Sequence, residues 1–331
     1  MLRDEFAKRQ FAVLKRDFYT HLTARFVAKL TYVATRLWLG VCACMLISLQ
    51  VSAAKSMALP YTQPGQDWES ESLPLGNGHL GITVLGGVSE DTIQFNEKTL
   101  WTGGPGSEEG YNFGFPGQPQ SYLNKVKSVQ AELRDKGQLA PEYVAERLGN
   151  NQTGYGSYQS FGTLQFTWPQ SHGRYQDYRR ELDLSTATAR VQYETDNGRF
   201  VREYFVSYPE NSIVIRLFAS GSAKISFTAS LHTPENRSRQ VKQLSESEVM
   251  YTGTLHNNDL QYAAGLRVIA DDADVTFHAD GAFSVAQASQ VTLVLTAATN
   301  YALQHPTYRG EDAENKVRGQ LAATRGDSYS E

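Results

Sequence analysis

The segment Trp68–Pro105 reads WESESLPLGNGHLGITVLGGVSEDTIQFNEKTLWTGGP and is the most informative part of the chain. It holds seven glycines, at positions 76, 78, 81, 86, 87, 103 and 104. Glycine at this density indicates backbone in unusual φ/ψ regions or in close contact with other atoms. The simplest interpretation is a set of tight turns between the first strands of a sheet. A phosphate-binding loop fits poorly, because G-x-x-x-x-G-K-[ST] is absent and Gly76-Asn77-Gly78 opens no helix.

Period-two alternation of apolar and polar residues recurs along the rest of the chain. In Thr163–Trp168, for example, Leu164, Phe166 and Trp168 share one face. Turn-forming residues separate successive candidate strands. The other candidates are Arg190–Glu194, Phe200–Val206, Ile213–Phe218, Lys224–Leu231, Gln261–Ile269, Val275–His278 and Val291–Leu295. Many short strands with few helices between them predict an all-β fold, a large antiparallel sandwich.

Three helices are expected among the strands. Pro119–Lys136 and Pro141–Leu148 each begin with a proline, which is favoured in the first turn of a helix. Glu311–Thr324 is more polar, with Ala313, Val317 and Leu321 in helical phase. Its position predicts a linker helix that leaves the sandwich.

The N-terminal residues 1–53 are predicted to be an extended leader with a signal peptide. The apolar run 37–49 is too short to span a bilayer comfortably, follows Arg36, and precedes small residues. Cleavage is expected between Ala53 and Ala54, which gives an exported protein, periplasmic or extracellular. Residues 1–36 are long for such a leader, and either an amphipathic helix or sequence upstream of the true start codon accounts for them. An uncleaved leader would be the one membrane contact.

Charge and cysteine content exclude several classes of protein. The chain has 331 residues and a formal net charge of −4, but residues 1–53 hold 8 basic and 3 acidic groups. The remainder is therefore acidic, which argues against nucleic-acid binding. Both cysteines, Cys42 and Cys44, lie in the apolar run, so the mature chain has no disulfide and no thiolate metal site. Neither H-E-x-x-H nor G-x-S-x-G occurs, and we expect no metal and no cofactor.

Several blocks of sequence, in order along the chain, resemble glycoside hydrolase family 95, which consists mainly of α-L-fucosidases with some α-L-galactosidases. The resemblance covers about residues 66–331. Family 65 glycosidases and phosphorylases have a related N-terminal sandwich and remain the alternative. The blocks are LPLGNGHLGITVLGG (73–87), IQFNEKTLWTGGP (93–105), YQSFGTLQF (158–166), YRRELDLSTATARV (178–191), REYFVSYP (202–209) and TAATNY (296–301).

The resemblance implies a domain plan. Proteins of the family join an N-terminal β-super-sandwich through a helical linker to an (α/α)6 barrel, which carries the inverting catalytic residues. No position of this chain matches those catalytic motifs, so no catalytic residue is assigned. The expected organisation is a leader (1–53), an N-terminal arm (54–65), the super-sandwich (66–303) and the start of the linker (304–331). The chain then looks like the first domain of a fucosidase, without the barrel.

Three residues of the glycine-rich segment are candidates for contact with substrate: Asn77, His79 and Trp101. For each there is a structural alternative: a local hydrogen-bonding role for His79, a buried sandwich tryptophan for Trp101, and support of a domain interface for the whole segment. The expected partners are the barrel of the same polypeptide and a fucosylated oligosaccharide. A free-standing carbohydrate-binding module and an inert structural sandwich remain alternative functions, since tyrosine is abundant, with 18 residues.

Overall fold

The computed structural model describes residues 57–114, 118–149, 153–169, 174–270 and 272–325. The predicted leader, its cleavage site between Ala53 and Ala54, and the last residues 326–331 lie outside this range.

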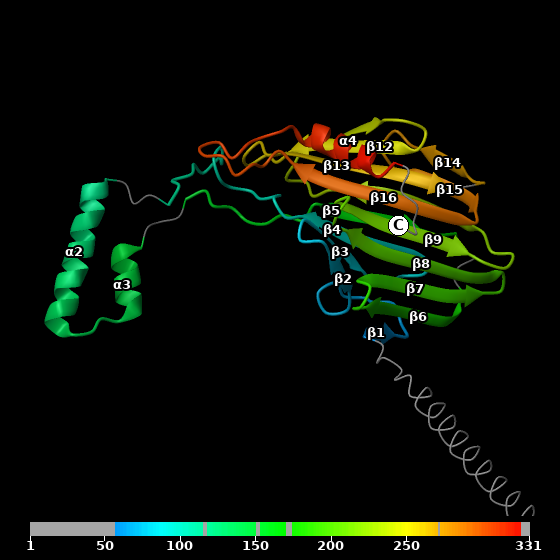
Figure 1. The fold of residues 1–331 in the computed structure, drawn as a ribbon, viewed down its shortest axis with the longest axis horizontal. Coiled ribbons are helices and arrows are strands. Elements are labelled where there is room, and N and C mark those ends of the chain that lie inside the picture. The colour runs from blue at the N-terminus through cyan, green and yellow to red at the C-terminus, as the bar shows by residue number, and fades with distance from the viewer. Residues whose placement is uncertain (1–56, 115–117, 150–152, 170–173, 271, 326–331) are drawn as a thin grey trace, which may run out of the picture. The chain divides into compact units, whose positions relative to one another are not determined.

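Within the described residues sixteen strands form two antiparallel sheets (Figure 1). The nine-stranded sheet has the order β1-β6-β7-β8-β9-β16-β13-β12-β11, and the seven-stranded sheet β14-β15-β10-β5-β4-β3-β2. The strands are β1 (Ala58–Tyr61), β2 (Leu73–Gly76), β3 (Leu80–Val84), β4 (Glu90–Glu97), β5 (Gly162–Thr167), β6 (Gln176–Asp183), β7 (Thr188–Thr195), β8 (Gly198–Ser207), β9 (Ser212–Ala219), β10 (Ile225–His232), β11 (Gln240–Gln243), β12 (Glu248–Thr254), β13 (Gln261–Ala270), β14 (Asp274–Phe277), β15 (Phe283–Ala288) and β16 (Gln290–Thr299).

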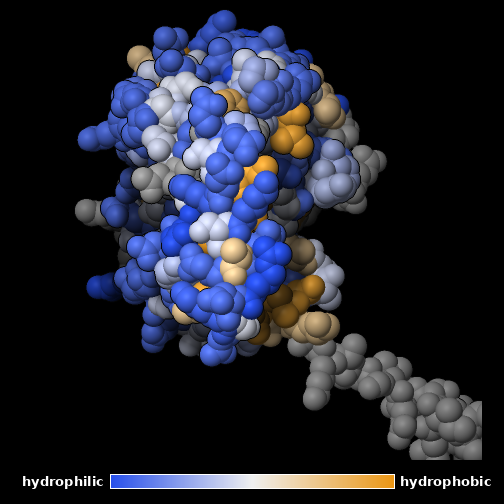
Figure 2. Space-filling view, turned by 90° about the vertical axis from the view of Figure 1, so that its left-hand side faces the viewer, coloured by the Kyte–Doolittle hydropathy of each residue, from blue (hydrophilic) through white to orange (hydrophobic). Residues whose placement is uncertain are grey.

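The inner faces of both sheets contribute to one hydrophobic core. Leu164, Phe166 and Trp168 are all buried, as their alternation predicted, and Phe166 stacks on Trp168 with ring centroids 5.4 Å apart. The predicted all-β sandwich is therefore confirmed. Figure 2 shows one face of the molecule, on which hydrophilic residues predominate and hydrophobic residues form small separate groups.

A buried ion pair joins the two sheets across this core. The guanidinium of Arg202 on β8 lies 2.9 Å from the carboxylate of Asp91 on β4, and both side chains are at most 3% exposed. The other carboxylate oxygen of Asp91 accepts hydrogen bonds from the backbone N–H groups of Gly86 (2.9 Å) and Gly87 (3.0 Å). Arg202 also lies over the ring of Trp168, 4.6 Å from its centroid. Both buried charges thus have partners, which offsets the cost of removing them from water.

The turn between β3 and β4 needs glycine to donate these bonds to Asp91. Gly86 has φ +78°, and a Cβ atom there would lie 2.7 Å from the hydroxyl of Tyr178. That hydroxyl donates a 2.7 Å hydrogen bond to the carbonyl of Gly86. The glycines at 86 and 87 therefore mark a turn held between the sheets, in agreement with the sequence interpretation.

Two helices form a pair of their own. α2 (Pro119–Lys136) and α3 (Pro141–Leu148) have the predicted bounds. Tyr143 on α3 donates a 2.7 Å hydrogen bond to Glu132 on α2. Arg147 lies 3.3 Å from the same carboxylate. Among the described helices, none is long and apolar enough to cross a membrane.

The third helix, α4 (Ala313–Ala323), packs on the outer face of the nine-stranded sheet. It buries the three residues predicted to be in phase, Ala313, Val317 and Leu321, against small residues of β13 and β16. Gly265 on β13 is required here, because a Cβ atom at this position would lie 2.6 Å from Leu321. A helix is thus present where the linker helix was expected, and it lies against the sandwich, while its role as a linker stays a prediction.

An ion cluster fixes the end of α4. Glu248 on β12 is buried and accepts hydrogen bonds from Arg267 on β13 (2.8 Å) and from Arg325, just after the helix (3.1 Å). Arg267 also donates to the carbonyl of Leu321. Burial alone would raise the pKa of Glu248, but the bonds from the two arginines hold it below its usual range.

We expect Arg202→Met to lower the free energy of unfolding by about 3–5 kcal/mol, because it leaves the carboxylate of Asp91 buried without its counter-ion. Urea denaturation followed by circular dichroism measures the change. Arg199→Met is the matched control, since Arg199 lies on the same strand with an exposed side chain. Equal midpoints for the two variants would contradict the proposed importance of the ion pair.

The lowered pKa of Glu248 predicts a pH dependence of stability. A depressed carboxyl pKa stabilises the folded state above the unfolded value, about 4.3, and this contribution is lost as the pH falls through the folded pKa. Glu248→Gln should therefore lower the urea midpoint at pH 6 more than at pH 3.5. The exposed neighbour variant Glu246→Gln should lack this difference. The same loss for Glu248→Gln at both pH values would refute the prediction.

Candidate functional site

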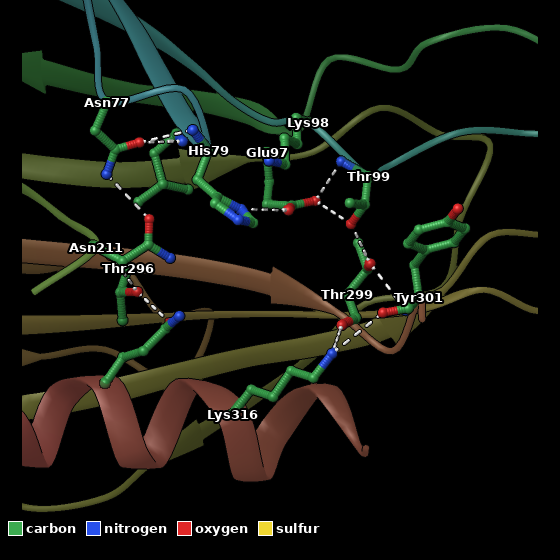
Figure 3. Close-up of polar contacts among 12 residues, drawn as sticks. Asn77, His79, Glu97, Lys98, Thr99, Asn211, Thr296, Thr299, Tyr301 and Lys316 are labelled. Atoms are coloured by element: carbon green, nitrogen blue, oxygen red, sulfur yellow. Dashed lines mark hydrogen bonds and ion pairs between the residues drawn. The ribbon is translucent and has the colours of Figure 1, made fainter. Parts of the chain in front are cut away.

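Asn77 organises the turn between β2 and β3. Its side-chain carbonyl accepts hydrogen bonds from the backbone N–H groups of His79 (2.8 Å) and Leu80 (2.7 Å). Its amide nitrogen donates to the carbonyl of Ser207 (2.7 Å) and to the side chain of Asn211 (3.0 Å). Asn77 therefore ties this turn to the connection between β8 and β9 (Figure 3).

His79 lies beside the last residue of β4. Its Nδ1 atom is 3.7 Å from Oε1 of Glu97, and the imidazole is half-exposed whereas Glu97 is buried. Burial raises the pKa of Glu97, although hydrogen bonds from Thr99 and the contact with His79 act in the opposite direction. The imidazole, from the turn before β3, and the carboxylate, from the end of β4, point toward one another (Figure 3).

Glu97 belongs to a longer polar chain. Its Oε2 atom accepts from the backbone N–H (2.8 Å) and the hydroxyl (2.7 Å) of Thr99, and that hydroxyl contacts the hydroxyl of Thr299. Lys316 on α4 donates to the carbonyls of Thr299 (2.9 Å) and Tyr301 (3.3 Å). The polar chain thus connects both sheets with α4, and Tyr301 projects from its end (Figure 3).

Trp101 and Tyr158 form an exposed aromatic pair close to this chain. Their ring centroids are 5.5 Å apart, and the two residues form an isolated antiparallel bridge. Trp101 is 47% exposed, so the expected alternative of a buried sandwich tryptophan is wrong for this residue. Trp168 takes that position instead, at 6% exposed. The indole Nε1 of Trp101 donates to the carbonyl of Lys98 (3.0 Å), which fixes the orientation of the ring.

The loop after Trp101 crosses a second loop at very close range. Gly103 and Gly156 both have positive φ, and a Cβ atom on Gly156 would lie 2.0 Å from the carbonyl oxygen of Thr102. Buried Asn258 donates to the carbonyls of Trp101 (3.0 Å) and Gly103 (2.6 Å). Two chain segments distant in sequence are therefore held in a fixed crossing.

A cavity of about 540 Å³ lies between these loops and the segment after β16. This volume is typical of a site for a small molecule. Its aromatic lining comes from three separate stretches of the chain, and its cations are Lys98 and Arg309. The aromatic residues are Trp101, Tyr111, Tyr155, Tyr301 and Tyr308.

The lining of the cavity contains no acidic side chain among the described residues. It therefore offers neither of the two carboxyl groups that glycoside hydrolysis requires. In that same part, no three His, Cys, Asp or Glu side chains are grouped so as to hold a metal ion.

The three residues predicted to contact substrate lie in different environments in the structure. Trp101 lines the cavity, His79 contacts Glu97 at half exposure, and the side-chain atoms of Asn77 bond to its own turn and to the neighbouring one. Contact with substrate stays a prediction for all three. Sequence reasoning missed the four tyrosines and Asn258, because no local motif joins them. The closely spaced glycines 154 and 156 were the available signal for this crossing.

Comparison with known proteins identifies related sequences. The family model described as "Glycosyl hydrolase family 65, N-terminal domain" matches residues 59–304. "Alpha-L-fucosidase 2" of Arabidopsis thaliana is 29% identical over 275 residues, which cover 75% of this chain and 31% of that protein. "Probable alpha-fucosidase A" of Aspergillus niger is 30% identical over 191 residues, 54% of this chain and 23% of that protein. "Probable alpha-fucosidase A" of Aspergillus oryzae is 28% identical over 174 residues, which cover 52% of this chain and 23% of that protein.

These matches confirm the resemblance to α-L-fucosidases that the sequence blocks indicated. The chain spans less than a third of the length of these curated relatives. The matching family model is that of the N-terminal domain of family 65, which was the alternative to family 95 in the sequence comparison above.

We expect Asn258→Ala to lower the free energy of unfolding by about 1–3 kcal/mol, because it leaves the carbonyls of Trp101 and Gly103 without their buried donor. The freed loop should also shift the fluorescence emission of Trp101. Asn124→Ala on the exposed face of α2 is the control for stability and for emission. An unchanged emission spectrum and an unchanged urea midpoint in Asn258→Ala would show that the crossing does not depend on this amide.

Proposed function

Because this chain belongs to the family described as glycosyl hydrolase family 65, N-terminal domain, we propose that it is the non-catalytic N-terminal domain of an exported, inverting α-L-fucosidase. The proposed parent enzyme belongs to glycoside hydrolase family 95 and acts on fucosylated glycans. The observation that carries the proposal is the 275-residue alignment with an α-L-fucosidase, which covers three quarters of the chain.

The described site supports a role without catalysis. An inverting glycosidase needs a general acid and a general base on opposite sides of the glycosidic bond, separated by about 6.5–9.5 Å. The lining of the cavity holds no carboxyl group, and the nearby Glu97 is buried and already accepts two hydrogen bonds from Thr99. In this proposal the general acid and the water-activating base belong to an (α/α)6 barrel, the partner of the sandwich within the parent polypeptide.

Export is the second part of the proposal. The apolar run 37–49, with Ala53 and Ala54 shortly after it, supports passage across a membrane with cleavage between the two alanines. The mature sandwich would contain neither Cys42 nor Cys44, so its stability outside the cell would rest on the core and on the ion pair of Asp91 with Arg202.

An activity assay tests the proposal in two arms. The 331-residue chain, expressed alone, should release no 4-nitrophenol from 4-nitrophenyl α-L-fucoside above a buffer blank. Native protein, captured from its source with an antibody against the sandwich, should hydrolyse the same substrate.

Each arm can fail separately. Turnover by the 331-residue chain would refute the non-catalytic role. Captured native protein that is inactive on α-L-fucosides would refute the assignment to a fucosidase. An α-L-fucosidase of known activity, mixed with the recombinant chain, controls for inhibition by the preparation.

A further inference from the structure

The cavity beside Trp101 presents an aromatic surface whose orientation is fixed before any ligand binds. The indole N–H of Trp101 is already bonded to the carbonyl of Lys98, and the backbone of Trp101 is bonded through its carbonyl to Asn258. The exposed half of the side chain is therefore available for stacking. A flat apolar surface of this kind matches the C–H face of a pyranose ring, and its rigidity reduces the entropy lost on binding.

Four tyrosines complete the lining of the cavity. Tyr301 and Tyr308 are stacked, with an interplanar angle of 4° and centroids 6.4 Å apart, and Tyr111 lies 5.3 Å from Tyr155. Burial, followed by the proximity of the hydroxyls of Tyr155, Tyr308 and Tyr301, raises the pKa of Tyr111. Both tyrosine pairs line the same cavity.

These hydroxyl groups retain their hydrogen-bonding capacity. Within the described residues, no hydrogen bond involves the hydroxyl of Tyr111, Tyr155, Tyr301 or Tyr308. Tyr178, Tyr251 and Tyr262, which are core tyrosines, each donate to a backbone carbonyl. Since each tyrosine hydroxyl both donates and accepts, four of them suit a ligand that carries several hydroxyls of its own.

The lining carries two cations and no carboxylate, and one of the two cations is already engaged. The guanidinium of Arg309 is engaged by the backbone, donating to the carbonyls of Asn258 (2.9 Å) and Pro105 (3.4 Å). Lys98 is exposed at the rim, and the described lining has no carboxylate to balance a cationic ligand. The lining is thus rich in rings and hydroxyls, and the half-buried guanidinium of Arg309 is already engaged by backbone carbonyls.

We propose that this cavity is a binding site for a neutral saccharide unit, with the ring of Trp101 against the apolar face of the sugar and the hydroxyls of Tyr301 and Tyr308 bonded to sugar hydroxyls. The site belongs to the sandwich itself and does not depend on hydrolysis. It therefore goes beyond the proposed function, which assigns the sandwich no ligand.

Isothermal titration calorimetry of the 331-residue chain tests the inference with three neutral probes: 2′-fucosyllactose, lactose and maltose. We expect saturable binding of at least one probe. Trp101→Ala should raise its Kd about tenfold or more, because it removes the stacking surface. Trp68→Ala is the matched control, since Trp68 is 51% exposed and lies outside the cavity. It should bind with an unchanged Kd.

A second pair of variants removes hydrogen bonds without removing rings. Tyr301→Phe and Tyr308→Phe should each raise the Kd about two- to tenfold. Phe is isosteric with the tyrosine ring, so a folding defect is not expected to confuse the result, and circular dichroism checks it. Tyr208→Phe is the control, because Tyr208 is 78% exposed and outside the cavity.

Three outcomes would overturn the inference: no saturable binding of any probe, binding that Trp101→Ala leaves unchanged, or sugar-independent dimerisation that Trp101→Ala abolishes. The last outcome would mean that a second copy of the chain occupies the cavity. Trp101-dependent binding of any of the three probes supports the inference. A failure of the fucosidase assay leaves the calorimetry intact, so the two proposals can fail independently.

Discussion

The fold depends on the buried ion pair between Asp91 and Arg202, because a charge inside a sandwich is tolerated only if its partners are fixed. Asp91 needs two backbone N–H groups as well as the guanidinium, and the glycine turn at 86 and 87 supplies them. The turn, the start of β4 and the centre of β8 are therefore fixed together. Period two then places Asp91, Ile93, Phe95 and Glu97 on the same inner face of β4. A single strand register thus determines both the ion pair and the position of Glu97 at the candidate site.

Clean alternation made some strands predictable from the sequence, and burial on both faces hid β12 but not β13, which was predicted as Gln261–Ile269. β5 and β10 alternate cleanly and were predicted to within a residue or two. β12 was missed because Glu248, Val249, Met250 and Tyr251 are all buried, the sheet core covering one face and α4 the other. Its alternation is lost since no face of the strand meets water there. The helix itself was recognised from the three apolar residues that it buries.

The candidate site was predictable only where it is local in sequence. Trp101 was found because it ends the glycine-rich segment, and its exposure follows from the bridge to Tyr158. Tyr155 and Tyr301 come from distant segments, and their meeting with Trp101 depends on which strands are neighbours. For Asn77 the local sequence pointed to the wrong kind of role. A polar residue between two glycines resembles a ligand-binding residue in sequence, whereas here its four hydrogen bonds hold two turns together.

In the proposed parent enzyme, α4 would link the cavity to the barrel. Lys316 on this helix donates to the carbonyls of Thr299 and Tyr301, so the cavity wall and the helix share one set of hydrogen bonds. The far end of α4 is fixed separately, by Glu248 with Arg267 and Arg325. A helix held at both ends transmits position as a rigid element, since bending it would break buried bonds. A saccharide in the cavity would therefore be held at a defined distance from the end of α4, where the proposed barrel begins. A binding site without carboxylates is useful to a glycosidase under that condition, because it can orient a glycan that another domain cleaves.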